Sequence, residues 1–196
     1  MSLKNSDLQY YDGNILRLSS EKRKEYHAQV DNLIAELRKH ITVNSDLKVK
    51  KVVKAGSFAK FTILKKTAED DIDVDVVFYI DGKNIDDTTL DNLNDLIYSL
   101  LTKIYPTKAV EDFEIQRRAA TVTFVKSGIS VDIVPVIQDE LDPNHGWQYD
   151  LKSKERNLTC APCHIQFIRD RKNSDKHYRT LVRMAKRWKN FENPPG

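Results

Sequence analysis

Three aspartates alternate with apolar residues in the segment Asp71-Ile72-Asp73-Val74-Asp75. Alternate residues of a β-strand point to the same side, so a strand here projects all three carboxylates from one face. Neighbouring carboxylates raise one another's pKa unless a cation lies between them. Mg²⁺ takes oxygen ligands and usually keeps substrate phosphates among them. The segment therefore predicts a magnesium site in a phosphoryl-transfer enzyme. The alternative is an exposed edge strand that its charges keep soluble.

Two further features extend this site. Gly56-Ser57 lies between a predicted strand and a helical turn, where glycine lets the backbone approach a phosphate and the turn adds N–H groups. Asp132 is a lone acid in the apolar string Val131-Asp132-Ile133-Val134-Pro135. A buried, unpaired carboxylate costs several kcal/mol, so Asp132 needs a partner. That partner is either a metal shared with the first aspartates or a salt-bridged side chain in the core.

The elements that must position these residues follow from the hydrophobic periodicity. One long helix is predicted from Ser19 or Ser20 to about His40, and a second from Thr88 or Thr89 to the residue before Pro106. Strands are predicted at 49–54, 71–80, 113–126 and 129–137. The fold class is therefore α+β, with a small mixed sheet backed by two long helices and followed by the start of a helical region. We expect a core at 1–150 and a helical segment at 151–196, the beginning of a C-terminal helical domain.

Composition and charge narrow the class of protein. Hydrophobic residues make up 40% of the 196 residues and charged residues 31%, which is typical of a soluble protein with an ordinary core. The sequence has no apolar run near the roughly 20 residues that span a bilayer and no signal-peptide core, so we expect a cytoplasmic protein without membrane contact. The segment 152–189 carries a charge of +9 and the remainder −6. This asymmetry suits a polyanionic substrate, although a solvated basic helix face explains it as well.

Cys160 and Cys163 are followed directly by His164. This string matches the c-type haem attachment pattern and half of a zinc site. Haem attachment needs export, and a structural zinc site needs four ligands, for which His145 and His177 are distant candidates. We expect two reduced thiols, with zinc binding as the alternative.

The combination of motifs resembles a known superfamily. Gly-Ser, a spacer of 13 residues, Asp-Ile-Asp on a strand and a third Asp on a later hairpin strand are similar to the DNA polymerase β-like nucleotidyltransferases. The strings Gly-Ser-Phe-Ala-Lys and Val-Asp-Ile-Val-Pro look most like the oligoadenylate synthetase and cyclic GMP-AMP synthase branch. Within it, the bacterial cGAS/DncV-like nucleotidyltransferases (CD-NTases) are most similar. The resemblance covers residues 20–190, including a late helix at 178–188.

The resemblance implies a polymerase β-like core and a nucleotidyltransferase activity. The enzyme would join nucleoside triphosphates into a cyclic oligonucleotide second messenger in bacterial antiphage defence and release pyrophosphate. ATP is the expected substrate, GTP and other nucleotides are further candidates, and a regulatory protein or a nucleic-acid activator is an expected partner. Three alternatives stay open: RNA-directed addition as in CCA-adding or poly(A)-type polymerases, nucleotidylation of a protein or small molecule, and a catalytically silent nucleotide-binding module.

The resemblance also implies roles for individual residues. Asp71, Asp73 and Asp132 would hold two Mg²⁺ ions, which Mn²⁺ can replace, and Asp132 could help to deprotonate the acceptor ribose hydroxyl. Asp75 is an alternative to Asp71, because the apolar residues that follow it can be aligned either way. The expected nucleotide-binding residues are Gly56, Ser57, Lys186, Arg183 as an alternative to Lys186, and Tyr178 as a base-stacking ring. Trp188 is a second candidate for stacking, but core packing is favoured for it.

Overall fold

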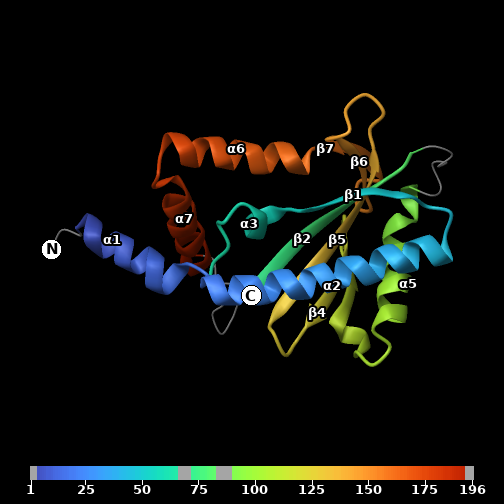
Figure 1. Ribbon diagram of the computed structural model, residues 1–196, viewed down its shortest axis with the longest axis horizontal. Coiled ribbons are helices and arrows are strands. Elements are labelled where there is room, and N and C mark those ends of the chain that lie inside the picture. Colours follow the sequence, from blue (N-terminus) through green and yellow to red (C-terminus); the bar gives the residue numbers. More distant parts are fainter. Residues whose placement is uncertain (1–3, 66–71, 83–89, 193–196) are drawn as a thin grey trace.

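The computed structural model describes residues 4–65, 72–82 and 90–192, and its strands form one mixed β-sheet between helices on both faces (Figure 1). The main strand order is β1-β2-β5-β4-β3, and β6 extends the sheet by pairing with both β5 and β7. Strands β2 and β5 are parallel, and the other pairs are antiparallel. The expected α+β class is confirmed. The strands are β1 Val49–Lys54, β2 Ile72–Ile80, β3 Phe113–Ile115, β4 Ala120–Phe124, β5 Ile129–Gln138, β6 Gly146–Asp150 and β7 Glu155–Thr159.

One face of the sheet packs against the two predicted long helices, α2 (Ser20–Asn44) and α5 (Leu93–Ile104). Ser19 is the N-cap of α2, and its side chain accepts a hydrogen bond from the backbone N–H of Lys22. The helix buries every third or fourth residue, which is the spacing that brings side chains onto one helix face. These residues are Tyr26, Val30, Leu33, Leu37 and Ile41. They share a core with the even-numbered β2 residues Val74, Val76 and Phe78.

The other face of the sheet carries the odd-numbered residues of β2, which include the aspartates. Helix α6 (Ala161–Ser174) covers the far part of this face, where Ala161 packs with Val77 and Tyr79. The short helix α3 (Gly56–Ala59) follows β1 and contacts β2. Since α2 and α5 fill the opposite side, the aspartate face is left to be shaped by α3, α6 and the next helix.

That next helix is α7 (Tyr178–Glu192), which returns to the N-terminal segment. The first described residues form α1 (Asn5–Tyr11) and a π-helical turn, η1 (Asp12–Leu16). Asp12 is buried in this turn and pairs with Arg183 of α7. The pairing joins the two ends of the described chain.

Two parts of the sheet differ from the sequence-based expectation. The strand predicted at 113–126 is preceded by η2 (Val110–Asp112) and splits into β3 and β4, because the chain turns where the Gln116 N–H bonds to the Ala119 carbonyl. Another hairpin, β6–β7, follows β5, and its second strand lies in the segment 151–196 that was expected to be helical. Arg117 and Arg118 from the first turn both bind the buried Asp150 at the end of β6. This long-range charge pairing is invisible to local periodicity.

The structure also bears on the cysteines, on Trp188 and on the possibility of a membrane-spanning helix. Cys160 and Cys163 were expected to be reduced thiols, which is wrong here: they form a disulfide, because the first turn of α6 places their Cα atoms 5.3 Å apart, within bridging range. The prediction that Trp188 packs in the core is also wrong, since Trp188 is 67% exposed. Among the described helices, none has the length and apolar character needed to cross a membrane.

Candidate active site

The parallel pairing of β2 and β5 places Asp75 directly beside Asp132. Asp73 lies two residues nearer the start of β2 on the same face, is more exposed, and is in register with Ser130. Asp71 lies outside the described residues. The structure therefore brings together one aspartate of the alternating segment and the lone acid of the later strand.

The environment of Asp132 disfavours its negative charge. Burial raises the pKa of this carboxyl, a hydrogen bond donated by the Thr121 hydroxyl at 2.6 Å lowers it, and the charge of Asp75 raises it again. The net effect is that the pKa of Asp132 is raised. A cation between the two carboxylates removes both penalties, as expected for a metal site. Thr121 was not predicted from the sequence, because its role depends on the β4–β5 register that sets it opposite Asp132.

Gly56 closes over Asp75. Its φ of +56° lies in the left-handed region that favours glycine, and the Ala55 N–H just before it bonds to the Asp75 carbonyl at 2.7 Å. A Cβ at position 56 would lie 1.6 Å from Asp75 Oδ2. Only glycine leaves room for this carboxylate, and the half-buried Ser57 follows at the same turn. The Gly-Ser motif and the Asp-rich strand are thus parts of one site.

A pocket of about 220 Å³ opens beside these residues. Asp75 and Val77 of β2 and Val134 of β5 form its sheet side, and Ala161 and His164 of α6 lie on another side. The remaining lining residues are Ala55, Gly56, Lys60, Gln148 and Thr159. The pocket therefore joins a carboxylate to a glycine turn and a lysine, which suits a metal-bound polyphosphate.

Two lysines lie close enough to Asp75 or to each other to interact. Burial lowers the pKa of Lys186 on α7, the charge of Lys60 lowers it further, and the charge of Asp75 opposes this change. Lys60 ends the α3 turn and was missed by the sequence reasoning, although it stands only four residues after Gly56. The predicted Lys186 and the unpredicted Lys60 thus supply positive charge beside the carboxylates.

Comparison with known proteins places the chain in a family. The Second Messenger Oligonucleotide or Dinucleotide Synthetase (SMODS) domain matches residues 1–171. The chain belongs to this family. The CBASS oligonucleotide cyclase CdnC of Escherichia coli (strain KTE188) is 53% identical over 195 residues, which cover 99% of this chain and 62% of the relative. The expected membership of the CD-NTases is confirmed.

Solved structures agree with this placement. E. coli MS115-1 CdnC in complex with HORMA-deltaN matches with a TM-score of 0.74 at 28% identity, over 98% of this chain and 59% of that one. The same CdnC with ATP matches with a TM-score of 0.73, over 95% and 57%. The chain thus spans about 60% of the length of these SMODS relatives.

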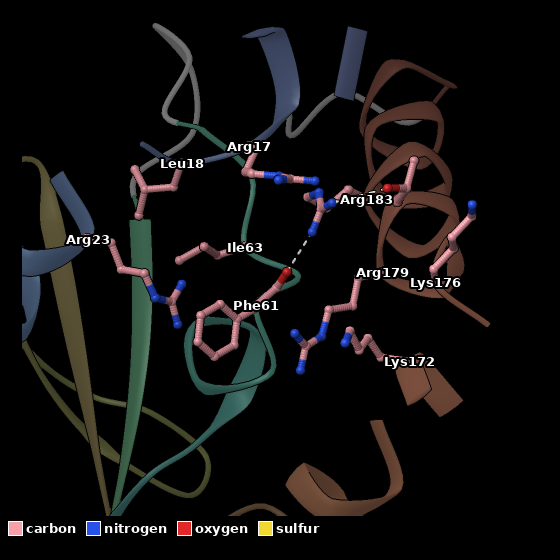
Figure 2. Close-up of a pocket in the computed structure, with 10 residues that line it drawn as sticks. Arg17, Leu18, Arg23, Phe61, Ile63, Lys172, Lys176, Arg179 and Arg183 are labelled. Atoms are coloured by element: carbon pink, nitrogen blue, oxygen red, sulfur yellow. Dashed lines mark hydrogen bonds between the residues drawn. The ribbon is translucent and has the colours of Figure 1, made fainter. Parts of the chain in front are cut away.

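Arg183, expected as an alternative phosphate ligand, does not line the pocket beside Asp75. Its guanidinium is buried, pairs with Asp12 at 2.6 Å, and donates to the Phe61 carbonyl at 2.6 Å, as the dashed line in Figure 2 marks. These contacts fasten α7 to η1 and to the segment after α3. Tyr178 begins α7, is half-buried, and lines neither of the two pockets described here. Its stacking role stays a prediction.

Arg183 also lines a second pocket, of about 240 Å³. Figure 2 shows this pocket with Phe61 and the other residues that line it. The Phe61 ring contacts two guanidinium groups, with the Cζ atoms of Arg23 and Arg179 at 3.7 and 4.8 Å from its centroid. Burial lowers the pKa of both arginines. The lining residues are Arg17, Leu18, Arg23, Phe61, Ile63, Lys172, Lys176, Arg179, Thr180 and Arg183. The basic C-terminal segment therefore concentrates its charge here as well as at Lys186.

Proposed function

We propose that this protein is a Mg²⁺-dependent nucleotidyltransferase that joins nucleoside triphosphates into a cyclic oligonucleotide second messenger. The observation that carries the proposal is the Asp75–Asp132 pair under Gly56, beside a pocket that Lys60 lines and near Lys186. A relative with 53% identity is an oligonucleotide cyclase, and a structural neighbour binds ATP. The chemistry of these residues and the family of the chain therefore support the same function.

The residues present fit a magnesium ion. Asp75 and Asp132 supply hard oxygen ligands, and burial and like charge make the pair unfavourable without a cation. We propose these two carboxylates with Asp73 as the ligands of two ions, and Asp75 in place of Asp71, because Asp75 touches the glycine turn. When bound, the ions stabilise charge on the attacking and leaving oxygens, and Mn²⁺ can substitute.

The other residues would bind the substrate and move its proton. Gly56 and Ser57 contact the phosphates, because the left-handed turn leaves their backbone open to an approaching oxygen. Lys186 and Lys60 neutralise the triphosphate and favour departure of pyrophosphate. Asp132 accepts the proton of the attacking ribose hydroxyl, because a carboxylate beside the acceptor can act as a general base.

The biological setting belongs to the same proposal. E. coli MS115-1 CdnC forms a complex with HORMA-deltaN, which favours a regulatory protein over a nucleic acid as the partner of this protein. We propose ATP as a substrate, with GTP as a further candidate, since a structural neighbour is solved with ATP. We also propose a cytoplasmic role in antiphage defence, which the similarity to a CBASS oligonucleotide cyclase supports.

Incubation of the protein with labelled nucleoside triphosphates and Mg²⁺ tests the proposal. We expect pyrophosphate release and small labelled products that resist phosphatase because their phosphates are internal. The matched control is Asp132→Asn, which removes one proposed ligand. Products that form only with added RNA, or label attached to a protein, would replace the cyclase with one of the other transferases. Nucleotide binding without turnover would leave a silent module.

A further inference from the structure

A second group of ligand-type side chains gathers at the start of α6. One ligand atom each of His145, Cys160 and Cys163 lies within 4.8 Å of the other two. The histidine comes from the loop between β5 and β6, and the cysteines come from the first turn of the helix. Once the disulfide is reduced, two thiol sulfurs and an imidazole nitrogen are a set that suits zinc.

The histidine is held in an orientation suited to a metal. His145 Nδ1 lies 2.9 Å from Asp142 Oδ2, the carboxylate–histidine arrangement that orients imidazole ligands and fixes their tautomer. With the Nδ1 proton donated to Asp142, the Nε2 lone pair is available. The His145 backbone N–H also bonds to the Asp142 carbonyl at 2.9 Å, and the Asn144 N–H bonds to Asp142 Oδ1 at 2.8 Å. The loop geometry therefore exists without an ion.

The buried Tyr79 holds the loop against the helix. Its hydroxyl donates to the Asn144 carbonyl at 3.0 Å and accepts a hydrogen bond from the Ala161 N–H at 3.3 Å. One side chain thus bonds to the neighbour of His145 and to the neighbour of Cys160. This link fixes the separation between the histidine and the cysteines from inside the core.

The cysteines are placed where thiolates are stabilised. Cys160 is the N-cap of α6, and its Sγ accepts a hydrogen bond from the Cys163 N–H at 3.2 Å. The thiolate is the form of cysteine that binds metal, and this turn of the helix supplies an N–H donor to the sulfur. Cys160 is buried, whereas Cys163 is exposed and gives an ion a path of entry. The disulfide uses the same two sulfurs, so an ion can bind only when the pair is reduced.

We propose that reduced Cys160 and Cys163 bind a zinc ion together with His145, and that water takes the fourth position of the tetrahedron. His164, which follows the cysteines in the sequence, lines the nucleotide pocket instead. The ion fastens the start of α6, one wall of that pocket, to the loop after β5. This site does not depend on the proposed function.

Metal analysis of the reduced, tag-free chain tests the proposal. The protein is treated with a phosphine reductant, its two thiols are counted with a thiol reagent, and it is mixed with zinc and desalted before elemental analysis. We expect about one zinc per chain, in line with one three-ligand site. Cobalt in place of zinc should give thiolate charge-transfer absorption and the visible bands of tetrahedral coordination. A chain with two free thiols that retains neither metal would overturn the site.

Variants then identify the ligands, with circular dichroism as the check that each one folds. Cys163→Ser and His145→Ala should each weaken zinc binding at least roughly 10-fold and remove the cobalt spectrum, and Asp142→Asn should weaken binding about 10–100-fold. His177→Ala is the matched control, because this histidine lies outside the cluster. Zinc binding by His145→Ala equal to that of the original chain would refute the proposed ligand set.

Discussion

The proposed chemistry rests at the residue scale on two carboxylates that occupy neighbouring positions on adjacent strands. Adjacent strands run roughly 4.8 Å apart, so Asp75 and Asp132 cannot separate without breaking the sheet. The fold thus keeps two carboxylates together at a buried position, and burial, followed by the charge of Asp75, raises the pKa of Asp132. A metal ion bound between the two carboxylates offsets this unfavourable electrostatic energy.

Single substitutions in the Asp-rich segment should identify the ligand pair. Asp75→Asn and Asp73→Asn should lower turnover by about 10² or more, because each removes a metal ligand, whereas Asp71→Asn should keep most of the activity. Pyrophosphate release at saturating nucleotide and Mg²⁺ measures the effect. Loss of activity in Asp71→Asn, with Asp75→Asn active, would restore the ligand pair expected from sequence.

Asp132→Asn should stabilise the metal-free protein while abolishing activity. Because the folded pKa of Asp132 is raised, its charged form costs stability, and this cost is absent below the ordinary carboxyl pKa and complete above the raised one. Urea unfolding with a chelator should therefore show a higher free energy of unfolding for the variant at neutral pH and a smaller difference near pH 3.8. A less stable variant at neutral pH would mean that Asp132 is already paired in the fold.

At the element scale, two short segments set the site: the α3 turn, which covers Asp75, and η1, which anchors α7. Both depend on a conformation or contact that a single residue supplies. Gly56 supplies the left-handed turn, and Asp12 supplies the buried partner of Arg183. Substitutions at these positions should have separable effects on activity and stability.

Gly56→Ala should affect the site more than the fold. A non-glycine residue at positive φ costs roughly 1 kcal/mol or more, and the added Cβ also displaces Asp75. Gly128→Ala is the matched control, since Gly128 has a similar φ of +63° but lies in the turn before β5. We expect comparable losses of unfolding free energy and a much larger loss of turnover for Gly56→Ala. Equal turnover in the two variants would contradict the contact.

Asp12→Asn should destabilise the chain by about 3–5 kcal/mol, because it leaves the Arg183 guanidinium buried without its counterion. Burial opposes the charge of Asp12, but hydrogen bonds from Arg183, Thr180 and Arg17 outweigh it and lower the pKa to about 2. The stabilisation is thus complete above the ordinary carboxyl pKa and is lost as the pH falls through about 2.

Urea unfolding at neutral and acidic pH measures this loss, with the exposed Asp46→Asn as the control. The difference between Asp12→Asn and the original chain should shrink as the pH approaches 2. A variant as stable as the control at neutral pH would show that the pair does not hold α7.

At the scale of the whole molecule, the sheet separates two tasks. One face packs against α2 and α5 and forms the main core, and the other carries the carboxylates under α3, α6 and α7. Lys186 reaches this second face from the last helix, more than a hundred residues after Asp75. Substrate binding therefore depends on the docking of the basic segment onto the acidic one.

Lys186→Ala should weaken nucleotide binding by about 10–100-fold, the range expected when one charge-assisted hydrogen bond is removed. Lys189→Ala is the matched control on the same helix, at an exposed position. Titration with ATP and Mg²⁺ at two salt concentrations measures the difference. Equal affinities of the two variants would place the triphosphate away from α7.

The sequence by itself determined the long helices, most strands, the acidic face of β2 and the family, because period-two and helical spacings and the Gly-Ser…Asp-Ile-Asp pattern are local properties. It also identified Gly56, Ser57, Asp73, Asp132 and Lys186 as candidates for the site. It ranked Asp71 ahead of Asp75 only through the family resemblance, since strand alternation puts both on the same face.

The tertiary structure decided what depends on register and on long-range contact. The β2–β5 pairing sets Asp75 beside Asp132, and the α3 turn places Gly56 against Asp75. The ion pair with Asp12 holds Arg183 outside the pocket beside Asp75. The same kind of contact placed His145, not His164, beside the two cysteines. Such neighbours are at least 15 residues apart in the chain, and only the pairing of strands and the docking of helices makes them adjacent.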